Sequence, residues 1–157
     1  MLVTINTDAS YCQENNIGAY AFWIVCNDFK IKRGGLFKDG CESSAIAEKK
    51  AIINALASLG EKQKSHCRVI VNTDSNSAIG IFTHPNWLSQ NRKNPTYVLY
   101  AQLRKQFEDL TRFFDVEFRH VKAHNGTSDA RSYVNDWCDK TAKHYLRKKR
   151  KELLCKK

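Results

Sequence analysis

The N-terminal quarter of the chain has the hydrophobic pattern of a β-sheet. Residues 2–7 (LVTINT) alternate in polarity and are rich in residues that favour strands. Residues 18–25 (GAYAFWIV) and 29–37 (FKIKRGGLF) follow after short polar segments. This pattern predicts three consecutive strands in an antiparallel meander.

From residue 43 the period of the pattern changes. Residues 43–60 (SSAIAEKKAIINALASLG) begin with serines that can cap a helix and end at a glycine, so we predict a helix there. Residues 67–73 are a short apolar run typical of a buried parallel strand, and residues 74–82 predict a short capped helix. Residues 84–95 contain both prolines and predict a loop or a broken helix.

The remaining residues predict a helix at 96–113, a strand at 116–121 and a last helix from 135 to about 150. The order βββαβααβα predicts an α/β fold, in which helices flank a mixed five-stranded sheet of three antiparallel strands followed by parallel ones. A chain of 157 residues without repeats or a linker suits a single domain. We place this domain at residues 1–146 and a basic C-terminal tail at residues 147–157.

Positive charge is concentrated at the C-terminus. The formal net charge is +10, and residues 143–157 hold eight Lys or Arg and one Glu, so they supply +7 and leave +3 for the rest. A positive chain favours polyanions such as nucleic acid. Two interpretations of the tail stay open, a solvated helix end or a segment that binds phosphates.

Two further features of the sequence concern the cellular location of the protein and the state of its cysteines. No apolar run approaches the roughly 20 residues that cross a bilayer, and the first ten residues lack the pattern of a signal peptide, so we expect a cytoplasmic protein without a membrane partner. The six cysteines show no spacing that would hold zinc, and we expect reduced thiols.

Several carboxylates stand where folding alone does not require them. Asp8 and Asp74 come at the ends of predicted strands, where open α/β sheets place their sites, although each could instead cap a turn or helix. Glu48 falls on the apolar stripe of the predicted helix at 43–60, and Lys49 and Lys50 point elsewhere. A charge on that stripe costs free energy unless it is paired, binds a cation or snorkels outward.

Three aspartates near the C-terminus differ in their expected surroundings. If the last helix begins at Asn135, Asp139 lies on an inward stripe with Ala142, whereas Asp136 lies on a solvated stripe with lysines and arginine. Asp129 falls in a polar loop and is expected to be a turn residue. We therefore choose Asp139 as the candidate site residue.

Asp8, Glu48, Asp74 and Asp139 together would form an acidic cluster in a basic protein. Such a cluster repels itself unless divalent cations neutralise it, and ligands that are all oxygen atoms favour Mg²⁺ or Mn²⁺. Carboxylates in a basic surround suit phosphodiester cleavage with two metal ions, one activating water and one stabilising the leaving oxygen.

The motifs TDAS, AIAEKKA, NTDS, HVKAH and VNDWCDKTA, in this order, resemble ribonuclease H type 1 from Leu2 to about Leu146. The resemblance implies that the four carboxylates bind two Mg²⁺ (or Mn²⁺). It also implies that a monomeric enzyme cleaves the RNA strand of an RNA/DNA hybrid to leave 5′-phosphate and 3′-hydroxyl ends. His124 matches a loop histidine of the family that assists proton transfer and product release.

The resemblance further implies contacts with nucleic acid. The candidates are Ser10, Asn16, Ser43, Ser44, Trp87, Arg92 and Lys93, and Trp87 could equally serve packing. The sequence departs from the family at Ala9, which replaces a glycine, at residues 43–45 (SSA), which replace a Thr-Asn-Asn-like run, and at the turn QENNIG. The loop after His124 is also longer than in the family.

Other functions are compatible with the predicted architecture. A non-catalytic hybrid-binding module would be favoured by a missing carboxylate, and none is missing. An exonuclease motif Asp-x-Glu would require Glu at position 10, where Ser10 stands, which argues against a proofreading-type nuclease. A domain of a reverse-transcriptase-like protein stays open.

Overall fold

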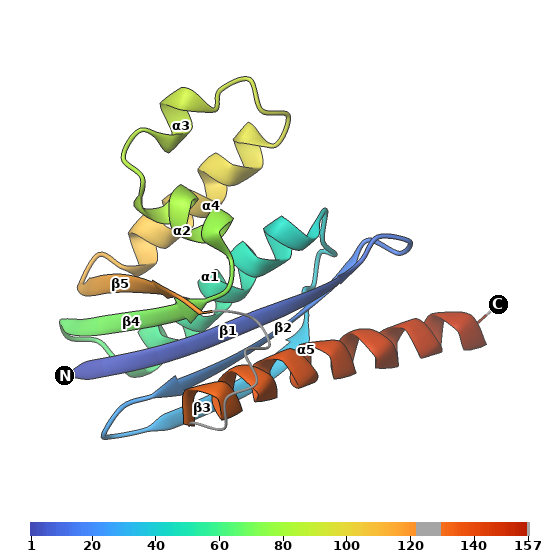
Figure 1. Ribbon diagram of the computed structural model, residues 1–157, viewed down its shortest axis with the longest axis horizontal. Coiled ribbons are helices and arrows are strands. Elements are labelled where there is room, and N and C mark those ends of the chain that lie inside the picture. The colour runs from blue at the N-terminus through green and yellow to red at the C-terminus, as the bar shows by residue number, and fades with distance from the viewer. Residues whose placement is uncertain (122–129, 157) are drawn as a thin grey trace.

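The computed structural model describes residues 1–121 and 130–156 (Figure 1). The strands of this part are β1 (Leu2–Cys12), β2 (Ile17–Val25), β3 (Lys30–Leu36), β4 (Cys67–Thr73) and β5 (Phe114–His120). The helices are α1 (Ser44–Lys62), α2 (Asn76–Thr83), α3 (Trp87–Gln90), α4 (Tyr97–Leu110) and α5 (Ala130–Cys155). The element order agrees with the predicted order. At residues 84–95, where we expected a loop or a broken helix, the chain forms the short α3 with loops on either side.

All five strands form one mixed sheet in the order β3-β2-β1-β4-β5. β1 pairs antiparallel with β2 and parallel with β4, and β5 continues the parallel part. This arrangement confirms the predicted α/β fold. The β1–β4 pairing runs only from Leu2 to Asn6, whereas β1 stays paired with β2 as far as Cys12. The edge of β1 that faces β4 is therefore unpaired beyond Asn6, which leaves room for side chains there.

Helices cover both faces of the sheet (Figure 1). On one face, α1 packs against β1 and β2, and α4 packs against α1, so that the main core includes Val3, Ile5, Leu56 and Phe107. On the other face, α5 packs across β1, β2 and β3. Alternate residues of β1 consequently face α1 or α5.

The close approach of α5 to the sheet depends on a small residue in β3. A Cβ atom added at Gly34 would lie 2.6 Å from Cγ2 of Thr141 and 3.0 Å from Cε2 of Tyr145. Because real Cβ contacts are longer than this, glycine at position 34 lets α5 lie flat on β3. Cation–π contacts support the same packing, since Lys32 Nζ lies 4.0 Å from the ring centroid of Trp23 and 4.6 Å from that of Trp137.

The last helix differs from the prediction at both ends. We expected a start at Asn135 and an end near residue 150, whereas α5 begins at Ala130 and ends at Cys155. The helix also continues across residues 146 and 147, where we divided domain from tail. No helix within the described ranges is long and apolar enough to span a bilayer.

Candidate active site

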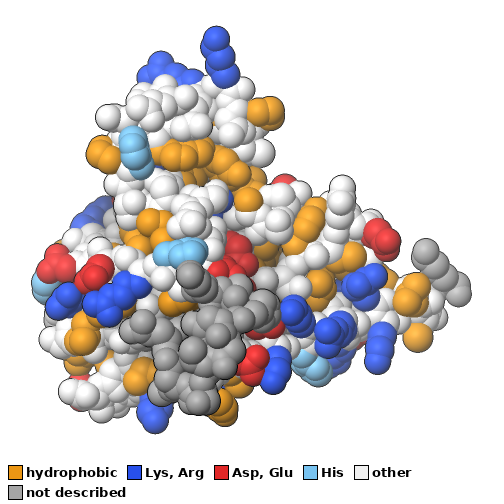
Figure 2. Space-filling view, in the orientation of Figure 1, with side chains coloured by type: hydrophobic (Ala, Val, Ile, Leu, Met, Phe, Trp, Pro, Cys, Tyr) orange, Lys and Arg blue, Asp and Glu red, His pale blue; other side chains and the backbone are white. Residues whose placement is uncertain are grey.

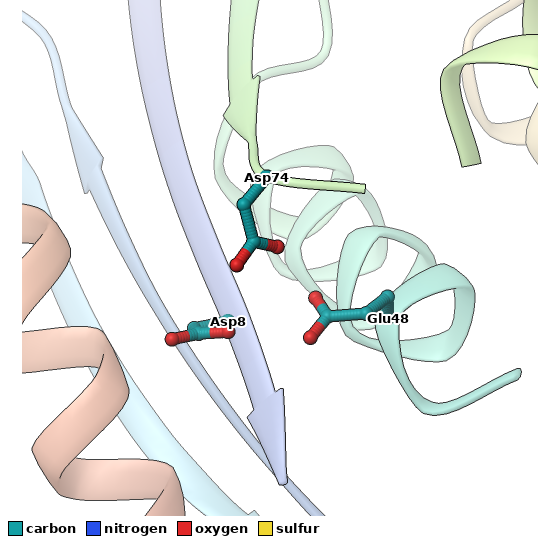
Figure 3. A group of neighbouring side chains, drawn as sticks. All are labelled: Asp8, Glu48 and Asp74. Atoms are coloured by element: carbon teal, nitrogen blue, oxygen red, sulfur yellow. The ribbon is translucent and has the colours of Figure 1, made fainter. Parts of the chain in front are cut away.

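Three carboxylates from separate elements converge where β1 and β4 cease to pair. Asp8 lies on β1, Glu48 on α1, and Asp74 directly after β4. One oxygen from each lies within 4.8 Å of the other two. In Figure 3 the side chains of Glu48 and Asp74 point toward Asp8. These three residues are among those that the sequence singled out.

Local structure holds each carboxylate in place. The Oγ atom of Ser43 accepts a hydrogen bond from the backbone N–H of Ile46 at 3.1 Å and caps α1, so Glu48 stands in the second turn of that helix. Ser75 caps α2 in the same way directly after Asp74. The backbone N–H of Ala9 donates to Oδ1 of Asp8 at 2.9 Å.

The cluster strongly favours bound protons while no cation is present. Burial, followed by the charge of Asp74, raises the pKa of Asp8 to about 7. Burial, followed by the charges of Asp8 and Asp74, raises the pKa of Glu48 to about 10. Ionising these carboxyls is therefore unfavourable unless a bound cation compensates their charge.

These residues suit a hard divalent cation. All three ligand groups are carboxylates, which Mg²⁺ and Mn²⁺ prefer to sulfur ligands. Oε2 of Glu48 is buried and has no hydrogen-bond partner within the described part of the chain. A buried oxygen without a donor is costly, and a cation bound between the carboxylates would satisfy it.

Asp139 lies beside this group and outside it. Its charge makes a smaller contribution to the raised pKa of Asp8, after burial and the charge of Asp74. Its Oδ2 atom accepts a hydrogen bond from Lys143 Nζ at 3.0 Å, and its side chain is 20% exposed. Asp136 is more exposed and pairs with Lys140 at 2.8 Å. Lys143 stays partly exposed, and its flexible side chain reaches back one turn to Asp139.

A buried polar network fixes α5 against the strands below the site. Nδ2 of Asn6 donates to Oδ1 of Asn135, and Nδ2 of Asn72 donates to Oδ1 of Asn6 at 3.2 Å. The Cys138 thiol donates to the backbone oxygen of Asn6 at 3.6 Å. These contacts join β1, β4 and α5, the elements that carry or precede Asp8, Asp74 and Asp139. Our sequence analysis missed this network, and its signal was a pair of asparagines at inward positions of two strands.

Lys49 is a buried cation next to Glu48 in the sequence. Its Nζ atom donates to Oγ of Ser77 at 2.7 Å and to the backbone oxygen of Ala45 at 3.2 Å, and lies 4.8 Å from the ring centroid of Tyr100. Burial lowers the pKa of this lysine to about 8, against a smaller opposing effect of Glu48. Lys49 thus links α1 to α2 and α4. The sequence did not predict its burial.

One histidine of the described residues lies next to Asp74. His124, the candidate for proton transfer, and Asp129 lie outside the described residues. His120, at the end of β5, places Nε2 3.2 Å from the backbone oxygen of Asp74. This exposed histidine was not among our candidates.

The candidate nucleic-acid contacts fall into two separate groups. Ser10 lies on β1, and the exposed Asn16 lies in the β1–β2 turn with φ of 50°. The backbone N–H of Cys41 donates to the backbone oxygen of Asn16 at 2.8 Å, which ties this turn to the segment before α1. Ser43 caps α1 and Ser44 is its first residue, so this first group lies on the two elements that carry Asp8 and Glu48 and on the turn tied to them.

The second group lies on and after α3, at the top of Figure 1. Arg92 and Lys93 are exposed in the loop that follows this helix. Trp87 is half-buried and packs edge to face with Tyr100, with ring centroids 5.2 Å apart. This contact shows that Trp87 contributes to packing.

The chain matches the RNase H family over residues 2–147. A search of curated proteins found no match. Among solved structures, it is similar to RNase H1 from the halophilic archaeon Halobacterium salinarum NRC-1. The TM-score is 0.66 and the identity 18%, over 94% of this chain and 99% of that one.

Two further structures share the fold. One is LC9-RNase H1, described as a type 1 RNase H with the type 2 active-site motif, with a TM-score of 0.66 and 18% identity over 92% of this chain and 73% of that one. The other is the prototype foamy virus protease-reverse transcriptase, with a TM-score of 0.63 and 12% identity over 92% of this chain and 20% of that one.

Proposed function

The chain belongs to the RNase H family, whose members are nucleases that act on RNA/DNA hybrids, and from this we propose a specific reaction. The enzyme hydrolyses the RNA strand of a hybrid endonucleolytically by a two-metal mechanism and leaves 5′-phosphate and 3′-hydroxyl ends. The observation that supports this proposal best is the group formed by Asp8, Glu48 and Asp74, whose oxygens lie within 4.8 Å of one another.

Asp8, Glu48 and Asp74 would hold the Mg²⁺ or Mn²⁺ ions, with Asp139 beside them. Bound ions would supply an activated water and stabilise the leaving oxygen. The raised pKa values of Asp8 and Glu48 mean that protons compete for the same oxygens, so activity should increase as the pH rises toward and above about 7. In this proposal His124 accepts or donates a proton near the scissile bond.

Recognition of the substrate would use the first group of candidate contacts. Ser10, Asn16, Ser43 and Ser44 carry short polar side chains that suit 2′-hydroxyl groups and phosphates in the minor groove of a hybrid. Arg92 and Lys93 would hold phosphates further away. The distinction between RNA and DNA then depends on the polar groups near the carboxylates rather than on charge alone.

One experiment tests the reaction directly. The protein is incubated with end-labelled RNA/DNA, RNA/RNA, DNA/DNA and single-stranded RNA in Mg²⁺, Mn²⁺ or EDTA. We expect cleavage of the RNA strand in the hybrid alone, only with a divalent cation, and none by Asp74→Asn. Absence of metal-dependent cleavage of the hybrid would refute the proposal.

A hybrid-binding module without cleavage is the second candidate function. The ion pair between Lys143 and Asp139 favours it, because the lysine neutralises the one carboxylate that stands outside the group. In that case the protein would bind the hybrid in the same assay and leave it intact, and Lys143→Met would not create activity.

A further inference from the structure

α5 extends beyond the body of the molecule. Leu146 is the last buried residue of the helix, where it packs on Cys12 and Ala19. The following residues 147–156 are exposed or half-buried, and all but the last lie in the helix. In Figure 1 this end of the helix projects past the sheet to the right. We call residues 147–156 the basic arm.

The charge of the basic arm is not balanced within the protein. The arm holds six Lys or Arg and one Glu, a net +5, which is half of the net charge of +10. Lys149 pairs with Glu152 at 3.8 Å, and the other five cations form no ion pair with any described residue. Arg147 and Lys151, four residues apart, face each other with like charge, which costs a few tenths of a kcal/mol. A helix dipole favours cations in its last turn only, so it does not account for the run that starts at Arg147.

The arm continues the helix that carries Asp139. Asp139 and the arm belong to the same helix, and with a rise of 1.5 Å per residue Arg150 lies about 16 Å and Lys156 about 25 Å from Asp139 along the axis. The packing of Leu146 on Cys12 also places the start of the arm at the end of β1, next to the turn that carries Asn16. Figure 2 shows Lys and Arg side chains gathered over this projecting end, on the same face as acidic side chains near the centre.

Duplex phosphates fit this spacing. One strand of a duplex presents a phosphate about every 3.4 Å along the axis, so the arm would reach phosphates roughly five to eight base pairs from the carboxylates. A membrane surface fits less well. Residues 147–151 are five consecutive cations, which point in all directions around a helix with 100° per residue. The apolar residues of the arm are Leu153, Leu154 and Cys155, which are consecutive and form no continuous stripe. A helix that lies in a membrane interface needs a continuous apolar face.

We propose that the basic arm binds the phosphate backbone of the duplex on one side of the cleavage position, five to eight base pairs away. This inference rests on the proposed function, which places the duplex on the carboxylates. The arm contacts phosphates and does not contact bases, so the part of the duplex that it binds can be RNA/DNA or DNA/DNA. It lengthens the footprint and strengthens binding without taking part in hydrolysis.

The test measures binding to duplexes that are extended on one side. An eight-base-pair RNA/DNA core carries a twelve-base-pair DNA/DNA flank either 5′ or 3′ of its RNA strand. Dissociation constants are measured by fluorescence anisotropy in EDTA, so that cleavage plays no part. We expect one flank, and not the other, to strengthen binding about tenfold or more at 50 mM salt. The triple variant Lys148→Gln, Arg150→Gln, Lys151→Gln should lose this gain and keep the helix, because Gln has nearly the helix propensity of Lys.

Salt dependence provides a second measurement. Each lost phosphate contact lowers the slope of log K against log[salt] by about 0.9, so three lost contacts lower it by up to about 2.7. Raising the salt from 50 to 200 mM should weaken binding of the favoured duplex by both proteins. The loss of affinity should be up to about 40-fold larger for the wild-type protein than for the triple variant. The turnover number on a saturating core hybrid in Mg²⁺ should stay the same.

A matched control separates the arm from charge in general. The triple variant Lys62→Gln, Lys64→Gln, Lys105→Gln removes the same charge from exposed positions on and after α1 and on α4, and it should keep the flank effect. The proposal would be overturned if both triple variants lose the same affinity, if the two flanks have equal effects, or if neither flank has an effect.

Two other outcomes separate the arm from the proposed reaction. Arm-dependent binding to anionic vesicles without a flank effect would overturn the proposal and assign the arm to membranes. Flank-dependent binding without cleavage in Mg²⁺ would refute the proposed reaction and leave the arm's role intact.

Discussion

Replacing Asp8 by Asn should stabilise the metal-free protein while it abolishes hydrolysis. The folded protein holds Asp8 close to Glu48 and Asp74, and its pKa rises from 3.8 to about 7 because burial and the charge of Asp74 oppose ionisation. Above pH 7 the wild-type protein must ionise this carboxyl in an unfavourable place. Asn carries no charge and keeps an oxygen that can accept the 2.9 Å hydrogen bond from the backbone N–H of Ala9.

The size and pH range of the effect follow from the pKa. A rise of about three pKa units corresponds to a ceiling of about 4 kcal/mol, at about 1.36 kcal/mol per unit. The new amide N–H₂ group needs partners in a buried site, which offsets part of this, so we expect a gain of about 1–3 kcal/mol at pH 8. Since the pKa of Asp8 is raised on folding, its contribution to stability is present below pH 3.8 and is lost as the pH rises through about 7. The gain from Asp8→Asn therefore grows from pH 4 to 7 and levels off above that.

The measurement is urea unfolding of both proteins in EDTA at pH 5, 6, 7 and 8. Mg²⁺ should then stabilise the wild-type protein more than Asp8→Asn, because a ligand that binds only the folded state adds to its stability. Asp136→Asn serves as the control, since this exposed aspartate lies away from the cluster and its loss should change stability little at any of these pH values. Two results would contradict this account of the cluster. Asp8→Asn could be less stable than the wild-type protein at pH 8 in EDTA, or its gain in free energy of unfolding could be the same at every pH.

Three further variants test neighbouring residues. Asp139→Asn should lower the turnover number on a hybrid by about 100-fold or more, whereas Asp136→Asn should keep near-normal steady-state rates; the opposite order would show that the α5 register has been misjudged. His124→Ala should reduce turnover by roughly 10- to 100-fold and flatten its pH profile, because water replaces a general acid only in part; an unchanged profile would exclude proton transfer by this residue. Lys49→Met should raise the free energy of unfolding by about 1–2 kcal/mol at pH 7, because burial opposes the charge of this lysine. The stability advantage of the variant should shrink above pH 8, because the lysine of the wild-type protein loses its proton there. Denaturant unfolding of both proteins at pH 7 and pH 9.5 measures this difference.

The sequence was sufficient for the fold because its signals are local. Alternation and β-branched residues mark the strands, and serines and a glycine mark α1, so the element order follows without long-range information. The three carboxylates could be found for a related reason. The sequence places Asp8 and Asp74 after apolar runs that a mixed sheet brings side by side, although β1 continues past Asp8 to Cys12, and Glu48 interrupts an apolar stripe.

The contacts that could not be predicted from the sequence depend on tertiary packing. Lys49 looks like an ordinary surface lysine in a helix, and only the approach of α2 and α4 shows that its amine lies buried against Ser77 and Tyr100. The pairing of Lys143 with Asp139 depends on a side-chain torsion, because helical spacing alone also allows this lysine to turn toward solvent. Composition likewise indicated a basic tail and could not show that it prolongs α5.

The central position of β1 has a consequence for folding during synthesis. Of the five strands, β1 is synthesised before the others and its antiparallel partner β2 follows soon after, so the three-stranded meander can form early. The other edge of β1 pairs with Arg68 to Asn72, which are made some sixty residues later. Until then the nascent chain exposes an unpaired edge that can pair with other strands. The same order delays the approach of Asp74 to Asp8 until β4 has docked, so the nascent meander forms before it meets the repulsion between these two carboxylates.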